Sequence, residues 1–175
     1  YQLFGASAWA IEAATVVLNT IAIGLALWIA HRRGGLAAVL GIAFVLALLM
    51  RGYGPSLLTL AWNPYLPLMW WFVFLLAVWS VVLDDLVMIP VGVFAGSLAM
   101  QTHVSYVGLV SGLSLFAAAV LGYHAWRRRR AGGSLRPMRI WVLAGVAVLV
   151  VLWIPPVIDQ FVHTPGNLST LWDYF

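Results

Sequence analysis

The sequence has no cysteine and no lysine, and charged residues of either sign are few. Without cysteine there is no disulfide framework, thiol nucleophile or thiolate metal site. Charged residues make up 8% of the 175 residues, whereas hydrophobic residues make up 64%. A soluble domain needs a charged surface, so this composition argues against a soluble protein and predicts an integral membrane protein. The sequence also lacks a Walker loop, an HExxH motif and a nucleophile elbow, which excludes the enzyme classes that depend on them.

Long apolar segments recur along the chain, and each is long enough to cross about 30 Å of hydrocarbon as a helix. They predict an all-α fold, a polytopic transmembrane helix bundle of about six spans in a single domain. The expected spans cover residues 10–30, 36–52, 66–83, 86–103, 106–126 and 139–155, followed by a tail over residues 156–175. Pro155 and Pro156 are expected to end the sixth span. Because the chain begins at Tyr1 and not at methionine, we expect it to be a segment of a longer protein.

The stretch from Leu86 to Trp126 has no charged residue and is 41 residues long. A single helix of that length would measure about 60 Å, twice the thickness of the hydrocarbon. The stretch must therefore fold back near its middle, where Gln101–Tyr106 is the only polar cluster. Small-residue motifs at 92–96 and 108–112 predict that the two helices of this hairpin pack closely.

The arginines indicate the orientation of the bundle. With six spans, eight of the nine arginines fall on one side, and Arg51 alone falls on the other. The positive-inside rule makes the arginine-rich side cytoplasmic, so both termini and the polar turn face outward. We therefore expect a multi-pass protein of the bacterial inner membrane. The four-arginine run from Arg127 is interpreted as an anchor beside anionic lipid headgroups and not as a nucleic-acid site. Asp84 and Asp85 are expected to form a solvated cytoplasmic turn.

The candidate site residues all lie on the expected outer side. Asn63 and Tyr65 either form an interfacial turn with an aromatic belt or contact a polar ligand. Gln101, His103 and Tyr106 lie at the hairpin tip, and the first two either cap backbone groups or bind a phosphate or sugar hydroxyl.

Two further outer positions have alternative roles. Asp159, beside Gln160, is either a general base or metal ligand or else a helix cap or loop residue. Arg51 either extends to lipid headgroups or binds a lipid-linked phosphate.

Four short motifs carry a family resemblance: WNPYLP (62–67), QTHVSY (101–106), PPVIDQ (155–160) and PGNL (165–168). Spaced between apolar spans, they resemble GT-C type glycosyltransferases, polytopic enzymes that use polyprenyl-phosphate-linked sugars at the outer face of the membrane. The resemblance implies transfer of a sugar from the lipid carrier to a glycan or protein acceptor in the cell envelope. For such a substrate at the outer interface, we assign Arg51 or His103 to the phosphate and Gln101 and Asn63 to hydroxyl groups of the donor or acceptor.

The family's usual catalytic acid follows the first span of the complete protein, and no residue here matches it. We therefore expect that acid upstream of Tyr1, and a fragment that is inactive alone. No bound cofactor is expected, with a divalent metal held at Asp159 left open. The expected partners are membrane lipids, the polyprenyl-phosphate-linked sugar and its acceptor, and no nucleic acid. Two other functions stay open, a transporter or flippase of lipid-linked substrates and a non-catalytic structural membrane subunit.

Overall fold

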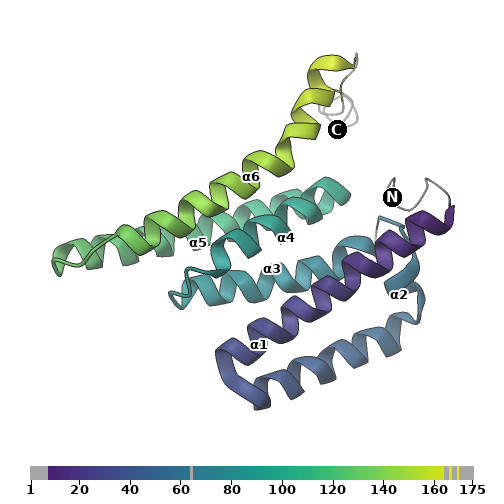
Figure 1. Ribbon diagram of the computed structural model, residues 1–175, viewed down its shortest axis with the longest axis horizontal. Coiled ribbons are helices and arrows are strands. Elements are labelled where there is room, and N and C mark those ends of the chain that lie inside the picture. The colour runs from purple at the N-terminus through teal and green to yellow at the C-terminus, as the bar shows by residue number, and fades with distance from the viewer. Residues whose placement is uncertain (1–7, 64, 164–165, 167–168, 170–175) are drawn as a thin grey trace.

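The computed structural model describes residues 8–63, 65–163, 166 and 169, and every regular element within them is a helix (Figure 1). The expected tail beyond residue 163 and most of the PGNL motif (165–168) lie outside the described residues, as do both chain ends. The helices are α1 (Ala8–Tyr53), α2 (Ser56–Thr59), α3 (Leu66–Val82), α4 (Met88–Thr102), α5 (Ser105–Arg130) and α6 (Arg136–Val162).

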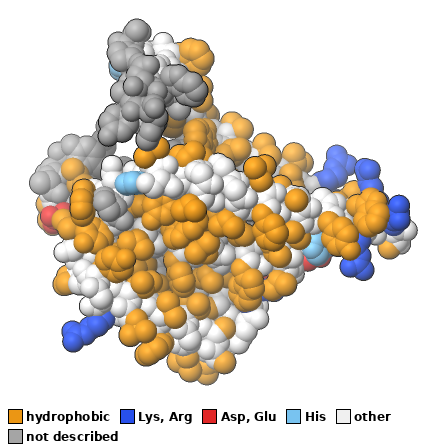
Figure 2. Space-filling view, turned by 180° about the vertical axis from the view of Figure 1, so that it is seen from behind, with side chains coloured by type: hydrophobic (Ala, Val, Ile, Leu, Met, Phe, Trp, Pro, Cys, Tyr) orange, Lys and Arg blue, Asp and Glu red, His pale blue; other side chains and the backbone are white. Residues whose placement is uncertain are grey.

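Three of these helices are long and apolar enough to cross a membrane, namely Trp9–Tyr53, Ser105–Arg130 and Arg136–Val162. The apolar helices α3 and α4 are shorter, at 17 and 15 residues. Large hydrophobic side chains such as Leu36, Leu115 and Val151 are exposed on the flanks of the long helices. Figure 2 shows hydrophobic side chains over most of the visible face, whereas basic side chains gather mainly at one end. A surface of this kind suits hydrocarbon and not water, so the fold is that of a membrane-embedded helical protein.

Helix α1 consists of two helices that meet at a sharp bend. Gly34 and Gly35 leave the helical conformation, and Gly35 has φ 60° and ψ −150°, a combination that glycine adopts far more easily than other residues. The second half of α1 runs back beside the first half (Figure 1). The chain therefore turns between the two segments that the sequence separates, residues 10–30 and 36–52.

Helices α3 and α4 form the centre of the bundle. They pack on each other, and α1, α5 and α6 pack around them. Helix α3 carries large apolar side chains on all sides, so it is stable only when it is surrounded by other helices or lipid. The fully buried core side chains include Ile29, Met69, Trp70, Val73 and Met88.

The chain folds back between α4 and α5, at Thr102–Ser105, within the polar cluster where the sequence places the reversal. Of the two small-residue motifs only the first lies in close packing. A Cβ atom at Gly96 would meet Val110 at 2.9 Å and the Phe74 ring at 3.0 Å, whereas nothing lies within 4 Å of a Cβ atom at Gly108 or Gly112. The prediction that the motif at 108–112 supports close packing is therefore wrong.

The prediction that Pro155 and Pro156 end the last helix is also wrong. Both prolines lie inside α6, which continues to Val162. Residues 156–162 are therefore helix and not tail, and α6 bends toward its C-terminal end (Figure 1). A proline lacks the N–H that an α-helix needs at that position, so the bend has a local cause.

Successive helices alternate in direction, so the polar segments gather at two opposite ends (Figure 1). The end that we name the arginine end holds the Gly34 bend, the α3–α4 turn and the α5–α6 connection. Its arginines are Arg32, Arg33, Arg127, Arg128, Arg129, Arg130, Arg136 and Arg139. The other end, named the turn end, holds the α4–α5 turn, the segment before α3 and the C-terminal part of α6.

Candidate functional site

A small pocket lies beside the α4–α5 turn, at the turn end. It has a volume of about 340 Å³ and is lined by Trp71, His103, Ser105, Tyr106 and Leu109. The Tyr106 ring lies 5.3 Å from the Trp71 ring and 6.3 Å from the imidazole of His103, centroid to centroid. The structure thus brings two of the candidate residues, His103 and Tyr106, into one aromatic-walled pocket of the size that small ligands use.

The backbone of the turn determines which nitrogen of His103 can donate. His103 is extended and caps α4, and its Nδ1 accepts the backbone N–H of Ser105 at 3.2 Å. In the neutral imidazole the proton must then be on Nε2, which is left as a donor. His103 therefore caps a backbone group, as one alternative predicts, and retains a donor suited to a phosphate or hydroxyl oxygen, so its binding role stays a prediction.

Trp71 is the aromatic residue of the pocket that the sequence does not reveal. It lies in α3 within a run of aromatic and aliphatic residues, where any of them suits a buried helix. Only packing distinguishes Trp71 from its neighbour, since Trp70 is buried in the core while Trp71 lines the pocket. No sequence pattern distinguishes the two tryptophans.

Gln101 has a structural role outside the pocket. Its Nε2 donates to the backbone carbonyl of Leu152 in α6 at 3.1 Å. That carbonyl would normally accept from the residue four positions later, which is Pro156 and has no N–H. The Gln101 amide therefore satisfies the carbonyl that Pro156 leaves unbonded, which fits the capping interpretation and explains how α6 continues through the prolines.

Tyr65 lies in a separate aromatic group next to α3. Its ring is 6.0 Å from the Tyr53 ring and 5.4 Å from the Trp62 ring. Asn63 and Arg51 are exposed on the same end, Arg51 in the last turn of α1. Among the described residues, neither side chain has a hydrogen bond or ion pair within the chain. This group matches the interfacial belt that the sequence predicts as one alternative.

Asp159 and Gln160 interact near the end of α6. Asp159 lies 2.9 Å from the Nδ1 atom of His163, an ion pair when the imidazole is protonated, and the Gln160 amide donates to the Ser169 hydroxyl at 2.8 Å. These bonds run along the chain and not toward the pocket. In the part of the chain that the structure describes, no three His, Asp or Glu side chains are grouped as a metal site would need. The roles of Asp159 as base or metal ligand stay predictions.

Asn19 is a polar residue in the first half of α1. It is fully buried, and its amide donates to the carbonyls of Leu57 and Leu58 at 3.2 and 3.1 Å. Those carbonyls belong to the short helix α2. Asn19 therefore anchors α2 against α1, and it does not line a polar path of the kind a transporter needs.

At the arginine end, Asp84 and Asp85 lie in the expected turn between α3 and α4, but the expectation that this turn is solvated is wrong for Asp85. Asp85 is nearly buried and accepts two hydrogen bonds from Arg32, at 2.7 and 3.0 Å. Asp84 is paired with Arg128 and lies 3.9 Å from the Nδ1 atom of His124. The two carboxylates thus tie the α3–α4 turn to α1 and to α5 through charge-assisted bonds.

Comparison of the chain with protein-family models, with curated proteins and with solved structures finds no match in any of the three. The resemblance to GT-C type glycosyltransferases therefore depends on the short motifs alone. Of the residues in these motifs, His103 and Tyr106 share a pocket, whereas Gln101, Tyr65 and Asp159 interact elsewhere.

Proposed function

We propose that this chain is the membrane-embedded part of an enzyme that transfers a sugar from a polyprenyl-phosphate carrier to a cell-envelope acceptor. In this proposal six helical segments cross the bacterial inner membrane, the two halves of α1 and helices α3 to α6. The arginine end faces the cytoplasm and the turn end faces outward, in keeping with the positive-inside rule. Both termini are then on the outer side.

The observation that carries the proposal is the pocket beside the α4–α5 turn. A lipid-linked sugar presents its phosphate and sugar at the interface, with its chain in the hydrocarbon. The pocket lies at the end of apolar helices and combines the indole of Trp71 and the phenol of Tyr106 with the Nε2 donor of His103. An aromatic wall suits the apolar face of a sugar ring, and the few polar groups fix its orientation.

The roles follow from these positions. His103 donates to the phosphate oxygen on which negative charge develops as the sugar departs, which is the form of stabilisation that oxyanion sites provide. Trp71 and Tyr106 hold the sugar. Arg51, exposed at the same end, is a cation available to the phosphate. The carboxylate that activates the acceptor hydroxyl is expected in another part of the protein, as the family resemblance implies.

A structural membrane subunit is the second candidate function. It is favoured by Gln101, whose amide is committed to the carbonyl of Leu152, and by Asp85, whose carboxylate is committed to Arg32. In that case the polar residues of the spans serve the bundle itself, and the pocket has no ligand.

The test is sugar transfer by membranes that carry the full-length protein, supplied with a radiolabelled polyprenyl-phosphate-linked hexose. We expect His103→Ala to lower transfer by about tenfold to a hundredfold, as the loss of a charge-assisted hydrogen bond would do. His163→Ala is the matched control, because it removes a histidine at the same end that lies outside the pocket.

Trp71→Leu is the second variant and Trp62→Leu its control, since both remove an indole but only Trp71 lines the pocket. Transfer that is equal in His103→Ala, Trp71→Leu and the unaltered protein would overturn the assignment of the pocket. The structural subunit would be favoured if the unaltered protein transfers no sugar and Gln101→Leu abolishes its association with other membrane subunits.

A further inference from the structure

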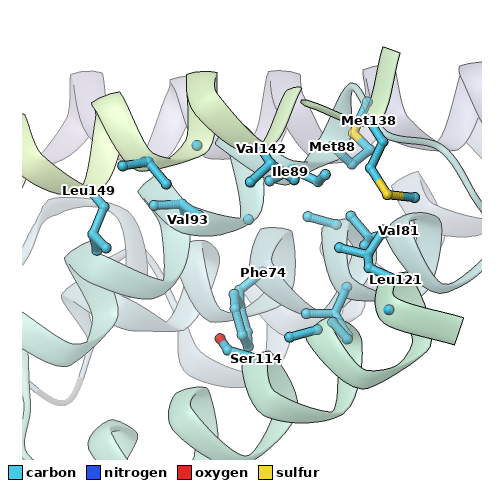
Figure 3. A pocket seen from close by; sticks show the side chains of 18 of the residues that line it. Phe74, Val81, Met88, Ile89, Val93, Ser114, Leu121, Met138, Val142 and Leu149 are labelled. Atoms are coloured by element: carbon cyan, nitrogen blue, oxygen red, sulfur yellow. The ribbon is translucent and has the colours of Figure 1, made fainter. Parts of the chain in front are cut away.

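A large apolar hollow lies between α5 and α6, with α3 and α4 as its floor. Its volume is about 460 Å³. We name it the α5–α6 groove; its walls include Ala118, Leu121 and Gly122 of α5 and Val142, Val146 and Leu149 of α6. In Figure 3 the side chains of Leu121, Val142 and Leu149 surround an open space above Phe74.

The groove exists because two neighbouring helices are held apart. Among the described helices, α5 and α6 each pack on α4 far more than on each other. Ala118 and Gly122 on one wall and Val142 and Val146 on the other are exposed. Nearly all of the lining is apolar, so water inside it would lack hydrogen-bond partners and an apolar occupant is favoured.

The length of the groove matches one half of a bilayer. It extends from Met138 to Leu149 along α6 and from Ala125 to Ser114 along α5, which is eleven helical steps on each helix. At 1.5 Å per residue this is about 16 Å, whereas the whole hydrocarbon core measures about 30 Å. The groove thus begins near the arginine end and stops near mid-membrane, the depth that one acyl chain of the adjoining leaflet occupies.

Positive charge lies at the open end of this groove. On α5 the residues that line the groove recur every three or four positions, and the last of them is Ala125. Arg128 and Arg129 follow one helical turn later on the same face. Arg128 is engaged with Asp84, and Asp85 is engaged with Arg32. Arg129 has no acidic partner among the residues that the structure describes, so its guanidinium is available to an anion from outside the chain.

From this juxtaposition we propose that the α5–α6 groove is a binding site for one anionic glycerophospholipid of the leaflet at the arginine end. One acyl chain occupies the apolar groove, and the phosphate accepts hydrogen bonds from Arg129. An arginine fork suits a phosphate, and the apolar length selects a chain that is already in the membrane. This site is at the opposite end from the pocket of His103, and it does not depend on the proposed function.

The test is native mass spectrometry of the detergent-solubilised protein after addition of dioleoyl phosphatidylglycerol or dioleoyl phosphatidylcholine. We expect one retained phosphatidylglycerol, bound roughly tenfold more tightly than phosphatidylcholine, since the two lipids share chains and differ in net charge. Gly122→Leu should abolish this selective retention by filling the groove, because nothing lies within 4 Å of a Cβ atom there. Gly112→Leu is its control, on the same helix, equally open and outside the groove.

Arg129→Gln should weaken phosphatidylglycerol retention by roughly tenfold without affecting the fold. Its control is Arg127→Gln, which removes the same charge from the same run but lies over the Tyr123 ring, on another face. Equal retention of the two lipids, or selective retention that persists in Gly122→Leu, would overturn the proposal. A dimer mass that Gly122→Leu abolishes would also overturn it and would make the groove a protein interface.

Discussion

Replacing Gln101 by leucine tests how the bundle tolerates two adjacent prolines in a membrane-embedded helix. The variant leaves the Leu152 carbonyl without its donor, because Pro156 has no N–H to replace the Gln101 amide. Single hydrogen bonds between helices in membranes contribute about 1 kcal/mol. We therefore expect the free energy of unfolding to fall by about 1 kcal/mol, measured by circular dichroism during titration of detergent micelles with sodium dodecyl sulfate.

Combining Gln101→Leu with Pro156→Ala shows whether the effect of Gln101 depends on the N–H that Pro156 lacks. Alanine at this position restores the helical N–H to the Leu152 carbonyl, so the amide of Gln101 becomes dispensable. In the Pro156→Ala background, Gln101→Leu should lower the free energy of unfolding by less than about 0.3 kcal/mol, a difference no larger than the usual deviation from additivity. Pro155→Ala is the control. It restores the N–H that bonds to the Val151 carbonyl, and it leaves the Leu152 carbonyl without a helical donor. If Gln101→Leu costs the same in the unaltered protein, in Pro156→Ala and in Pro155→Ala, the Gln101 amide does not compensate for Pro156.

Three further predictions concern packing and pairing. Gly96→Ala should lower the free energy of unfolding by about 1–3 kcal/mol, since the new methyl would meet Val110 and Phe74 at 3.0 Å or less. Gly108→Ala on α5, with nothing within 4 Å, should not destabilise the protein in the same titration. Asn19→Ala should cost about 1–3 kcal/mol through two lost bonds to α2, and unchanged stability would show that those bonds contribute nothing. Asp85→Asn should lower the midpoint of thermal unfolding at low and at high salt, because the Asp85 carboxylate is nearly buried against Arg32. An effect that high salt abolishes would show that this ion pair behaves as an exposed surface pair.

The helical class and the reversal at Thr102–Ser105 could be predicted from the sequence, because both depend on local composition and on length. The hairpin follows from a simple limit, since 41 uncharged residues exceed the thickness of a bilayer as one helix. The bend at Gly34 and Gly35 is local in the same way, and the two glycines stand between two apolar segments.

The continuation of α6 through Pro155 and Pro156 could not be predicted, because the bond that permits it comes from Gln101, 51 residues away. The pairing of Asp85 with Arg32 spans 53 residues, and the sequence pattern around Asp84 and Asp85 resembles that of any polar turn. Spacing also failed to distinguish the two small-residue motifs, since only the packing partners of α4 decide that Gly96 is in close contact.

In the candidate site, the polar residues of the α4–α5 turn could be predicted as a group. Polar side chains at the end of apolar membrane helices are costly unless they have hydrogen-bond partners. Their division was not predictable. His103 turns to the pocket and Gln101 turns to α6, although they are two positions apart. The end of a helix changes the direction of successive side chains abruptly, and the backbone at His103 is already extended.

The proposed function requires that the turn end of the bundle faces outward, and the absence of cysteine allows this to be measured directly. Val104→Cys places a thiol at the exposed α4–α5 turn, and Ala131→Cys places one in the exposed α5–α6 connection. With a membrane-impermeant maleimide applied to intact cells, we expect labelling at position 104, and labelling at position 131 only after the membrane is permeabilised. Labelling at 131 in intact cells, with 104 protected, would contradict the proposed function, because the pocket of His103 would then face the cytoplasm.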